Sequence, residues 1–118
     1  MSEYPAVINM SMISGATRVL SLTWKEANEP INLTNWTARL QIRSKTTSPA
    51  VALELTSPNG IVLDADGGIY IEFTPDHTEQ LDPGSYRYDL RMADNDDTVI
   101  YLVEGAIRVK DPVTRVTV

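Results

Sequence analysis

Residues 81–92 read Leu-Asp-Pro-Gly-Ser-Tyr-Arg-Tyr-Asp-Leu-Arg-Met, a turn signal that leads directly into a strict alternation. Pro83-Gly84 is typical of a corner in the chain. After it, an alternating pattern places Tyr86, Tyr88, Leu90 and Met92 on one face and charged residues on the other. This is the pattern of a strand with one buried face, so residues 86–92 predict a strand that contributes to a core.

The position of Tyr86 in this stretch makes a more specific prediction. A Tyr shortly after a Leu-x-Pro-Gly corner is the arrangement called the tyrosine corner in immunoglobulin-like sandwiches. We therefore expect Pro83, Gly84 and Tyr86 to have structural roles, with Tyr86 buried and its hydroxyl bonded to the backbone near residues 75–81. The alternative is an ordinary core Tyr at the start of a strand.

The rest of the chain repeats the alternating pattern in short segments. Strands are predicted over residues 7–13, 19–24, 37–43, 51–56, 61–63, 69–74 and 98–110, with Gly105 as a bulge or close approach. Thr74 and Pro75 predict one helical turn over residues 74–81. Trp24 is expected to point inward and Trp36 to close one end of the core.

Such a series of strands predicts an all-β, immunoglobulin-like antiparallel two-sheet sandwich with Greek-key connections and one short helical turn. A small closed barrel is the alternative. The 118 residues suit a single domain over 1–118. Residues 113–118 are expected to form a flexible or partner-bound tail.

Composition argues against several function classes. Sixteen acidic and ten basic residues give a net charge of −6, so nucleic acid is not an expected partner. The longest apolar run, residues 99–103, is far too short to span a membrane, and no membrane partner is expected. The first residues lack the basic and apolar parts of a secretory signal, which predicts synthesis and folding in a cytoplasm.

The residues that could support catalysis or bind metal are few. There is no Cys, and His77 is the one His, placed between Asp76 and Glu79 without a nucleophile motif. We expect no catalytic residue, no cofactor and no enzyme activity. Asp64, Asp66 and residues 94–97 offer carboxylates, but they lie in turn sequences, so no metal site is predicted.

One sheet face is a candidate interface. If residues 37–43, 86–92 and 98–110 are neighbouring strands, their outer face carries Arg39, Arg43, Arg87, Arg91, Ile100 and Leu102. Cross-strand pairing of these arginines with Asp89 and Glu104 is one interpretation. A protein interface is the other, because Arg is enriched at interfaces. In the tail, Val113, Val116 and Val118 could add to a neighbour as an edge strand or simply fray.

Four stretches together carry a family resemblance, over residues 30–43, 67–69, 81–90 and 104–109. They resemble the small β-sandwich proteins of phage and prophage tail modules, and are similar in pattern to the N-terminal domain of baseplate upper proteins. The resemblance implies a non-enzymatic virion structural or tail-assembly protein, made in the bacterial host cytoplasm and then associated with the virion. It implies protein–protein interaction with other phage tail or virion proteins, and a homo-oligomer.

A function of another class remains open at this point. Trp24, Trp36 and Tyr70 could form a stacking platform for sugars, as in a carbohydrate- or ligand-binding adhesin-like module. Exposed aromatic residues in one groove would favour this alternative, and buried ones would remove it.

Overall fold

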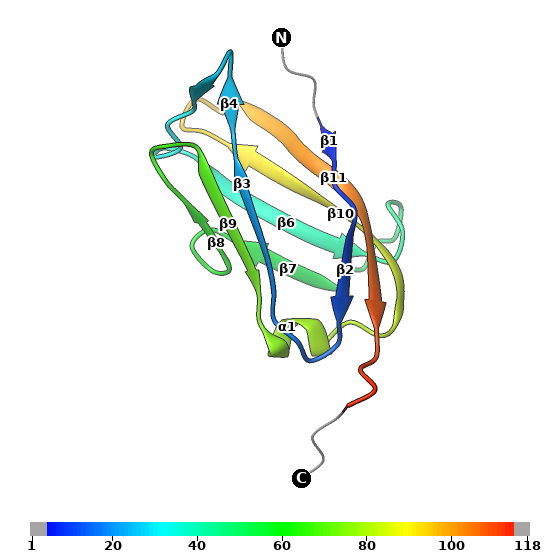
Figure 1. Ribbon diagram of the computed structural model, residues 1–118. Coiled ribbons are helices and arrows are strands. Elements are labelled where there is room, and N and C mark those ends of the chain that lie inside the picture. The colour runs from blue at the N-terminus through cyan, green and yellow to red at the C-terminus, as the bar shows by residue number, and fades with distance from the viewer. Residues whose placement is uncertain (1–4, 115–118) are drawn as a thin grey trace.

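Two sheets face one another across a core in the computed structural model, which describes residues 5–114 (Figure 1). The larger sheet has the order β1-β11-β10-β6-β7, with β2 also paired to β11. Its strands are β1 (Ala6–Val7), β2 (Met10–Ile13), β6 (Thr37–Arg43), β7 (Leu53–Thr56), β10 (Gly84–Ala93) and β11 (Val99–Lys110). The smaller sheet, β3-β9-β8, consists of β3 (Arg18–Thr23), β8 (Ile61–Leu63) and β9 (Gly68–Phe73). The two-sheet sandwich predicted from the sequence is confirmed, and its strands pair antiparallel except for β1 and β2, which run parallel to β11.

Strand β10, which contains the alternating stretch, lies at the centre of the larger sheet. It pairs antiparallel with both β6 and β11. Tyr88, Leu90 and Met92 are buried, as the alternation predicts, and they pack in the core shared by the two sheets.

Strand β11 contains a bulge that the sequence analysis placed elsewhere. Leu90 of β10 lies opposite Val103, but Arg91 lies opposite Tyr101, so Leu102 is the extra residue. Leu102 and Val103 are both buried, at 6% and 4% exposure. The bulge therefore shifts the alternation of β11 and changes which side chains reach its outer face.

Gly105 has the other role predicted for it, a close approach. A Cβ added at Gly105 would lie 2.0 Å from the carbonyl oxygen of Ile8, which belongs to the link between β1 and β2. That carbonyl accepts a hydrogen bond from the Tyr88 hydroxyl at 2.7 Å. The side-chain oxygen of Asn9 accepts from the Ala106 N–H at 3.0 Å. The side chains of Tyr88 and Asn9 thus bond the backbone C=O and N–H groups where the backbone hydrogen bonds between the N-terminal strands and β11 are interrupted.

The helical turn α1 (Pro75–Glu79) begins where Thr74 and Pro75 predicted it. Thr74 is the N-cap, and His77 completes a capping box: its N–H donates to Thr74 Oγ1, while its Nδ1 accepts from the Thr74 N–H. The buried Thr78 hydroxyl accepts from the Gly15 N–H at 3.0 Å and donates to the Ala16 carbonyl at 2.9 Å. Through Thr78, α1 holds the turn that joins β2 to β3.

The environment of Tyr86 differs in part from the prediction. Its hydroxyl donates to the backbone carbonyl of Asp82 at 2.7 Å, directly after residues 75–81, as predicted for a tyrosine corner, but the side chain is not fully buried. Tyr86 is half-buried because its ring lies at the margin of the core. Burial, followed by the nearby Asp82 carboxylate, raises its pKa.

A small hairpin follows β3. Strands β4 (Lys25–Glu26) and β5 (Glu29–Pro30) pair antiparallel, and Ala27 and Asn28 between them both have positive φ. Two central residues with positive φ define the type I′ turn, which matches the twist of a tight hairpin.

Candidate interaction surfaces

The arginine-bearing face is the outer surface of β6, β10 and β11, which are neighbours as the sequence analysis assumed. The register places Arg91 directly opposite Arg39, and Arg87 directly opposite Arg43. Like charges that face each other across a strand pair are destabilising. The fold itself therefore gains nothing from concentrating positive charge on this face.

The four arginines are held in different ways. Arg39 Nε lies 3.7 Å from Glu54 Oε2, and both side chains are largely exposed. Arg43 donates to the Ser48 carbonyl at 2.7 Å and to Gln41 Oε1 at 2.8 Å. Within residues 5–114, the side chains of Arg87 and Arg91 form no hydrogen bond or ion pair. These two guanidinium groups are free to bind a partner.

The expected pairing of Asp89 and Glu104 with the arginines is not what the register produces. Asp89 lies opposite Glu104, so two carboxylates face each other between the arginine pairs. Partial burial raises the pKa of Asp89 and the Glu104 carboxylate raises it further, while Arg43 lowers it by a smaller amount. In the described part of the chain, the Arg39–Glu54 contact is the one ion pair formed.

The placement of Ile100 and Leu102 on this outer face is wrong. Leu102 is buried and Ile100 is half-buried against the core, because the bulge at Leu102 reverses the alternation at this end of β11. Val99 and Tyr101 are exposed there instead, at 42% and 48%. The adjacent apolar residues Leu102 and Val103 break the alternation, and this signal could have located the bulge.

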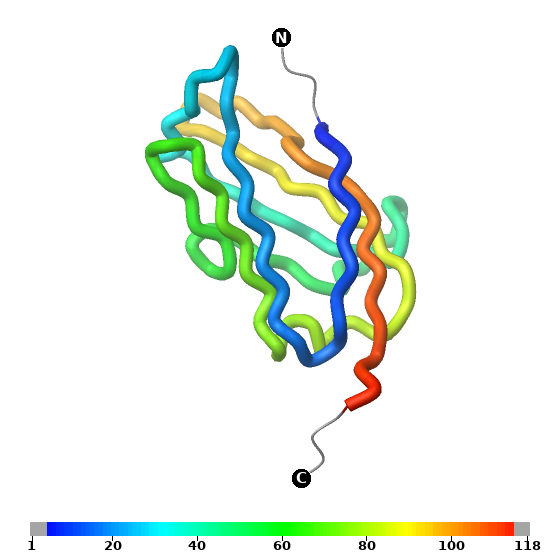
Figure 2. The backbone as a smooth tube through the Cα atoms, in the orientation of Figure 1, coloured from blue at the N-terminus to red at the C-terminus, as the bar shows by residue number. Residues whose placement is uncertain are grey.

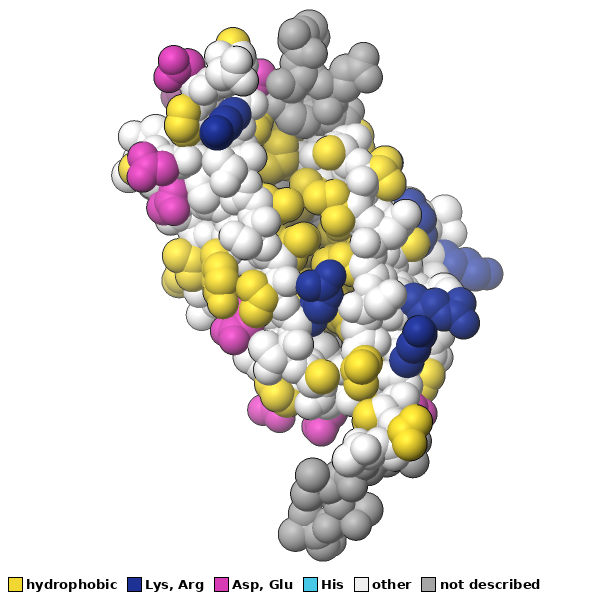
Figure 3. Space-filling view, viewed as in Figure 1, with side chains coloured by type: hydrophobic (Ala, Val, Ile, Leu, Met, Phe, Trp, Pro, Cys, Tyr) yellow, Lys and Arg dark blue, Asp and Glu magenta, His cyan; other side chains and the backbone are white. Residues whose placement is uncertain are grey.

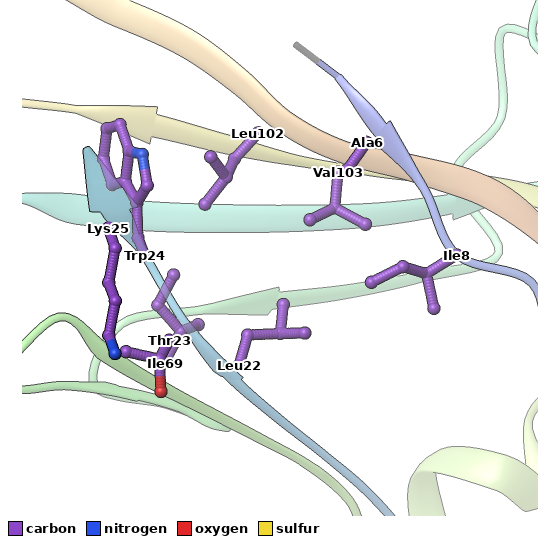
Figure 4. Close-up of a pocket in the computed structure, with 9 residues that line it drawn as sticks. All are labelled: Ala6, Ile8, Leu22, Thr23, Trp24, Lys25, Ile69, Leu102 and Val103. Carbon is purple, nitrogen blue, oxygen red and sulfur yellow. The ribbon is translucent and has the colours of Figure 1, made fainter. Parts of the chain in front are cut away.

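A second candidate surface is an apolar groove at the open side of the sandwich, with a volume of about 200 Å³. Figure 3 shows apolar side chains in the hollow between β3 and the edge formed by β1 and β11. In Figure 4, Leu22 of β3 and Trp24, which directly follows β3, lie across the groove from Ile8 and Val103. The full lining, which we call the β3 groove, is Ala6, Ile8, Leu22, Thr23, Trp24, Lys25, Ile69, Leu102 and Val103.

The β3 groove exists because two consecutive segments enter different sheets. Figure 2 shows the chain diverging from the turn after β2, with β3 in one layer and β1 and β2 in the other. The Arg18 side chain bridges the two segments: Nε donates to the Ser11 carbonyl at 3.1 Å and Nη1 to the Val19 carbonyl at 2.8 Å. Beyond this bridge, β3 has β9 as its one strand partner within the described residues.

The C-terminal segment is described only at its beginning. Val113 is 98% exposed, so it is available for contact as predicted. Val116 and Val118 lie outside the residues that the structure describes.

The acidic turns use their carboxylates to bind the backbone. Asp64 Oδ1 accepts from the N–H groups of Asp66 and Gly68, both at 2.8 Å. Asp94 Oδ1 accepts from those of Asp96 and Thr98, both at 2.9 Å. Over residues 5–114, no three His, Cys, Asp or Glu side chains come together as a metal site, and no helix there has the length and apolarity to cross a membrane.

The two tryptophans pack against each other. Their ring centroids lie 5.1 Å apart at an interplanar angle of 74°, an edge-to-face contact. Trp24 is 6% exposed, and Trp36 is half-buried against the core, in line with the structural roles predicted for both. Tyr70 is 44% exposed on the smaller sheet. The tryptophans therefore do not form the exposed stacking platform that the sugar-binding alternative requires.

Comparisons with known proteins identify the fold. No family model matches the chain, and no curated protein sequence matches it. A solved structure from work on multimeric cell-adhesive interactions of VGSC beta subunits is 12% identical, with a TM-score of 0.50, and the match covers 95% of this chain and 98% of that one. An extracellular domain of the voltage-gated sodium channel beta4 subunit, solved as a parallel homodimer, is 10% identical, with 99% and 96% covered and a TM-score of 0.44. The chain has the immunoglobulin-like sandwich fold that the sequence predicted.

Proposed function

We propose that this protein is a non-enzymatic assembly module that binds other proteins through its arginine-bearing face. The observation that carries the proposal is the pair of guanidinium groups of Arg87 and Arg91, which have no partner among residues 5–114 and each lie directly opposite another Arg. Exposed Tyr101 lies opposite Arg91 on the next strand. Tyr and Arg are the residue types most enriched among interface residues that dominate binding energy.

The finer proposal is a structural or tail-assembly protein of a phage or prophage virion. It is supported by the sequence resemblance over residues 30–43, 67–69, 81–90 and 104–109. Its partners would be other tail or virion proteins, together with further copies of the chain. Synthesis in the bacterial host cytoplasm followed by incorporation into the virion completes the proposal. The same fold takes part in multimeric cell-adhesive interactions in the VGSC beta subunits, which supports an interaction role in general.

Charge reversal at Arg91 tests the arginine-bearing face. The Arg91→Glu variant should weaken association with a tail-module partner, or self-association, by about tenfold or more, as loss of a central interface Arg does. The measurements are co-purification from a phage-producing host and sedimentation velocity of the purified chain. Because Arg91 lies opposite Arg39, the substitution should leave the melting temperature unchanged or slightly raised.

Lys45→Glu is the matched control, since it makes the same charge change at an exposed position in the loop between β6 and β7. It should associate as the wild type does. If Lys45→Glu weakens association as much as Arg91→Glu does, the effect comes from net charge alone, which would contradict specific binding through the arginine-bearing face. A wild-type chain that stays monomeric at high concentration and captures no virion protein would overturn the proposed function.

A further inference from the structure

The β3 groove combines two features that together define a binding site for an extended chain segment. One is an apolar channel of about 200 Å³ whose lining includes Leu22 and Val103. The other is an unpaired strand edge along the same channel, because β3 pairs with β9 on one side only among residues 5–114. An extended peptide that adds to a sheet edge gains main-chain hydrogen bonds there and places alternate side chains in pockets.

The hydrogen-bond pattern shows which backbone groups of β3 are free. In β9, the backbone N–H and C=O groups of the even-numbered residues point toward β8. The Glu72 N–H donates to the Gly60 carbonyl, and the Gly68 carbonyl accepts from the Asp64 N–H. The backbone groups of the odd-numbered residues of β9 therefore point toward β3. The register sets these residues opposite Arg18, Leu20 and Leu22, whose backbone groups bond to β9. By alternation, the N–H and C=O groups of Ser21 and Thr23 point away from β9 and into the open side.

Arg18 sets the limit of this free edge. Its guanidinium already donates to the Val19 carbonyl and to the Ser11 carbonyl across the gap. The part of the edge available to another strand is thus the segment from Ser21 to Thr23, beside the apolar groove. Thr23 and Lys25 lie at its rim, while Trp24 and Ile69 lie deeper.

The sequence that follows β11 has the composition of a strand that fits this edge. Residues 113–118 read Val-Thr-Arg-Val-Thr-Val, in which every residue but Arg115 is β-branched. In an extended conformation Val116 and Val118 fall on one face, and Arg115 and Thr117 fall on the other. The two valines would fill the groove while Arg115 and Thr117 face water.

The segment starts at the wrong end of the molecule to reach its own groove. The groove is lined by Val103 of β11, and a strand rises about 3.3 Å per residue, so Lys110 lies roughly 23 Å further along. Figure 1 shows β11 running away from β1 and toward the end of the molecule where α1 lies. An intramolecular insertion would require the segment to reverse and pass the Arg18 bridge.

We propose that the β3 groove binds residues 113–118 of a second copy of this chain, inserted as an additional strand on the edge of β3. The contact is head-to-tail: one copy supplies the groove and the next supplies the strand, so repetition closes a ring or extends a filament. The inference rests on the proposed function in that it names the chain itself as a partner. It uses a surface separate from the arginine-bearing face.

Disulfide trapping tests this contact directly, because the native chain contains no Cys. Thr23→Cys and Thr117→Cys are made in separate chains, which are then mixed and oxidised. Thr23 is exposed on the free edge of β3, and neighbouring strands bring same-face Cβ atoms within about 5 Å. Ser21→Cys serves as the alternative partner if the register differs. We expect a mixed dimer with either groove variant.

Val62→Cys is the matched control, since Val62 is 56% exposed on β8, the other edge strand of the smaller sheet. Its yield of mixed dimer with Thr117→Cys should be about tenfold lower, because the contact is specific to the β3 edge. Thr23→Pro, combined with Ser21→Cys, removes the free N–H without touching the β9 ladder, and should lower the trapping yield about fivefold.

Equal trapping at Val62 and Thr23, or none at either Ser21 or Thr23, would overturn the inference. A disulfide that forms only when Thr23→Cys and Thr117→Cys are in the same chain would show intramolecular insertion and overturn the second-copy assignment. A chain that shows no trapping specific to the β3 edge but still associates through the Arg91 face would reject the groove contact while sustaining the proposed function. If head-to-tail trapping occurs but the Arg91→Glu variant associates as well as the wild type, the groove contact is sustained and the role of the arginine-bearing face is rejected.

Discussion

Tyr88 connects β10, at the centre of the larger sheet, to the start of the chain. Its ring is buried, and its hydroxyl donates to the carbonyl of Ile8, which Gly105 leaves room for. Burial raises the pKa of Tyr88 to about 12, with a smaller opposing effect of Arg18. The corner pattern predicted a hydroxyl-to-backbone hydrogen bond for Tyr86 alone, and Tyr86 forms it with Asp82. The hydrogen bond from Tyr88 to the Ile8 carbonyl joins segments that are distant in the sequence, so no local sequence pattern predicts it.

Removing the Tyr88 hydroxyl should therefore cost more than removing that of Tyr86. Tyr88→Phe leaves the Ile8 carbonyl without its partner beside a buried ring, and should lower the free energy of unfolding by about 1–3 kcal/mol. Tyr86→Phe should cost about 1 kcal/mol or less, because water can reach the Asp82 carbonyl. Urea denaturation of both variants measures the difference, and an equal or reversed order would refute the assignment.

Asp89 makes a pH-dependent contribution to stability. Its pKa in the folded state is raised by partial burial and by Glu104, against the smaller opposite effect of Arg43. A raised carboxyl pKa means that the folded state binds the proton more tightly, so ionised Asp89 destabilises the fold, and the penalty disappears as pH falls through that pKa.

Asp89→Asn should accordingly stabilise the protein at pH 7 and have no such effect once wild-type Asp89 is protonated. The gain should be only a few tenths of a kcal/mol, because the carboxylate is partly exposed and screened. Thermal unfolding of wild type and variant from pH 3 to pH 7 tests the sign. An advantage that grows on acidification would contradict it. Glu104→Gln, which removes the facing charge, should lower the pKa of Asp89 in an NMR titration.

Two turns of the sandwich have the same hydrogen-bond pattern, but the residue with positive φ is closely packed in one turn and exposed in the other. In the turn from β8 to β9 and in that from β10 to β11, an Asp side chain accepts from the N–H groups two and four residues later. The residue before the last donor has positive φ in each: Gly67 at 80° and Asp97 at 61°. The Asp-rich sequences predicted both turns, yet they did not show that only Gly67 is packed against other backbone.

Substitutions at these equivalent positions should have opposite effects. Gly67→Ala would place a Cβ 2.5 Å from the Trp24 carbonyl at a left-handed φ, and should cost more than about 2 kcal/mol. Asp97→Gly removes a left-handed non-glycine residue at an exposed tip, and should change stability by between zero and about 1 kcal/mol in the favourable direction. Denaturation midpoints report both, and a neutral Gly67→Ala would refute the close approach.

In the complete fold, alternation and turn chemistry predicted the sandwich and most of its strands. The adjacency of β6, β10 and β11 was assumed from the immunoglobulin-like arrangement, and the sheet order agrees with it. Alternation and turn chemistry could not predict the open side, because a strand edge is free or paired according to contacts between distant segments. The same applies to the outer face of β11, where one extra residue, Leu102, exchanged Ile100 for Tyr101. Arginine positions on β6 and β10 were correct because those strands pair without a bulge.

The open side should be visible in amide hydrogen exchange. In the chain lacking residues 113–118, the N–H groups of Ser21 and Thr23 should exchange at least about a hundredfold faster than those of Leu20 and Leu22, which face β9. NMR-detected exchange at low protein concentration measures each amide separately. Uniform protection along β3 would mean that another segment covers its edge.

The pairing of the first strands with the last one has a consequence for biosynthesis. Ala6 lies beside Val103 and Met10 beside Ile107, so β1 and β2 can pair with their partner strand only after β11 has been synthesised. Before β11 is made, β10, β6 and β7 can pair with one another and β3, β9 and β8 can form the smaller sheet, but β1 and β2 lack their partner. The two N-terminal strands therefore join the sandwich only once β11 is in place, and this pairing between distant segments slows folding.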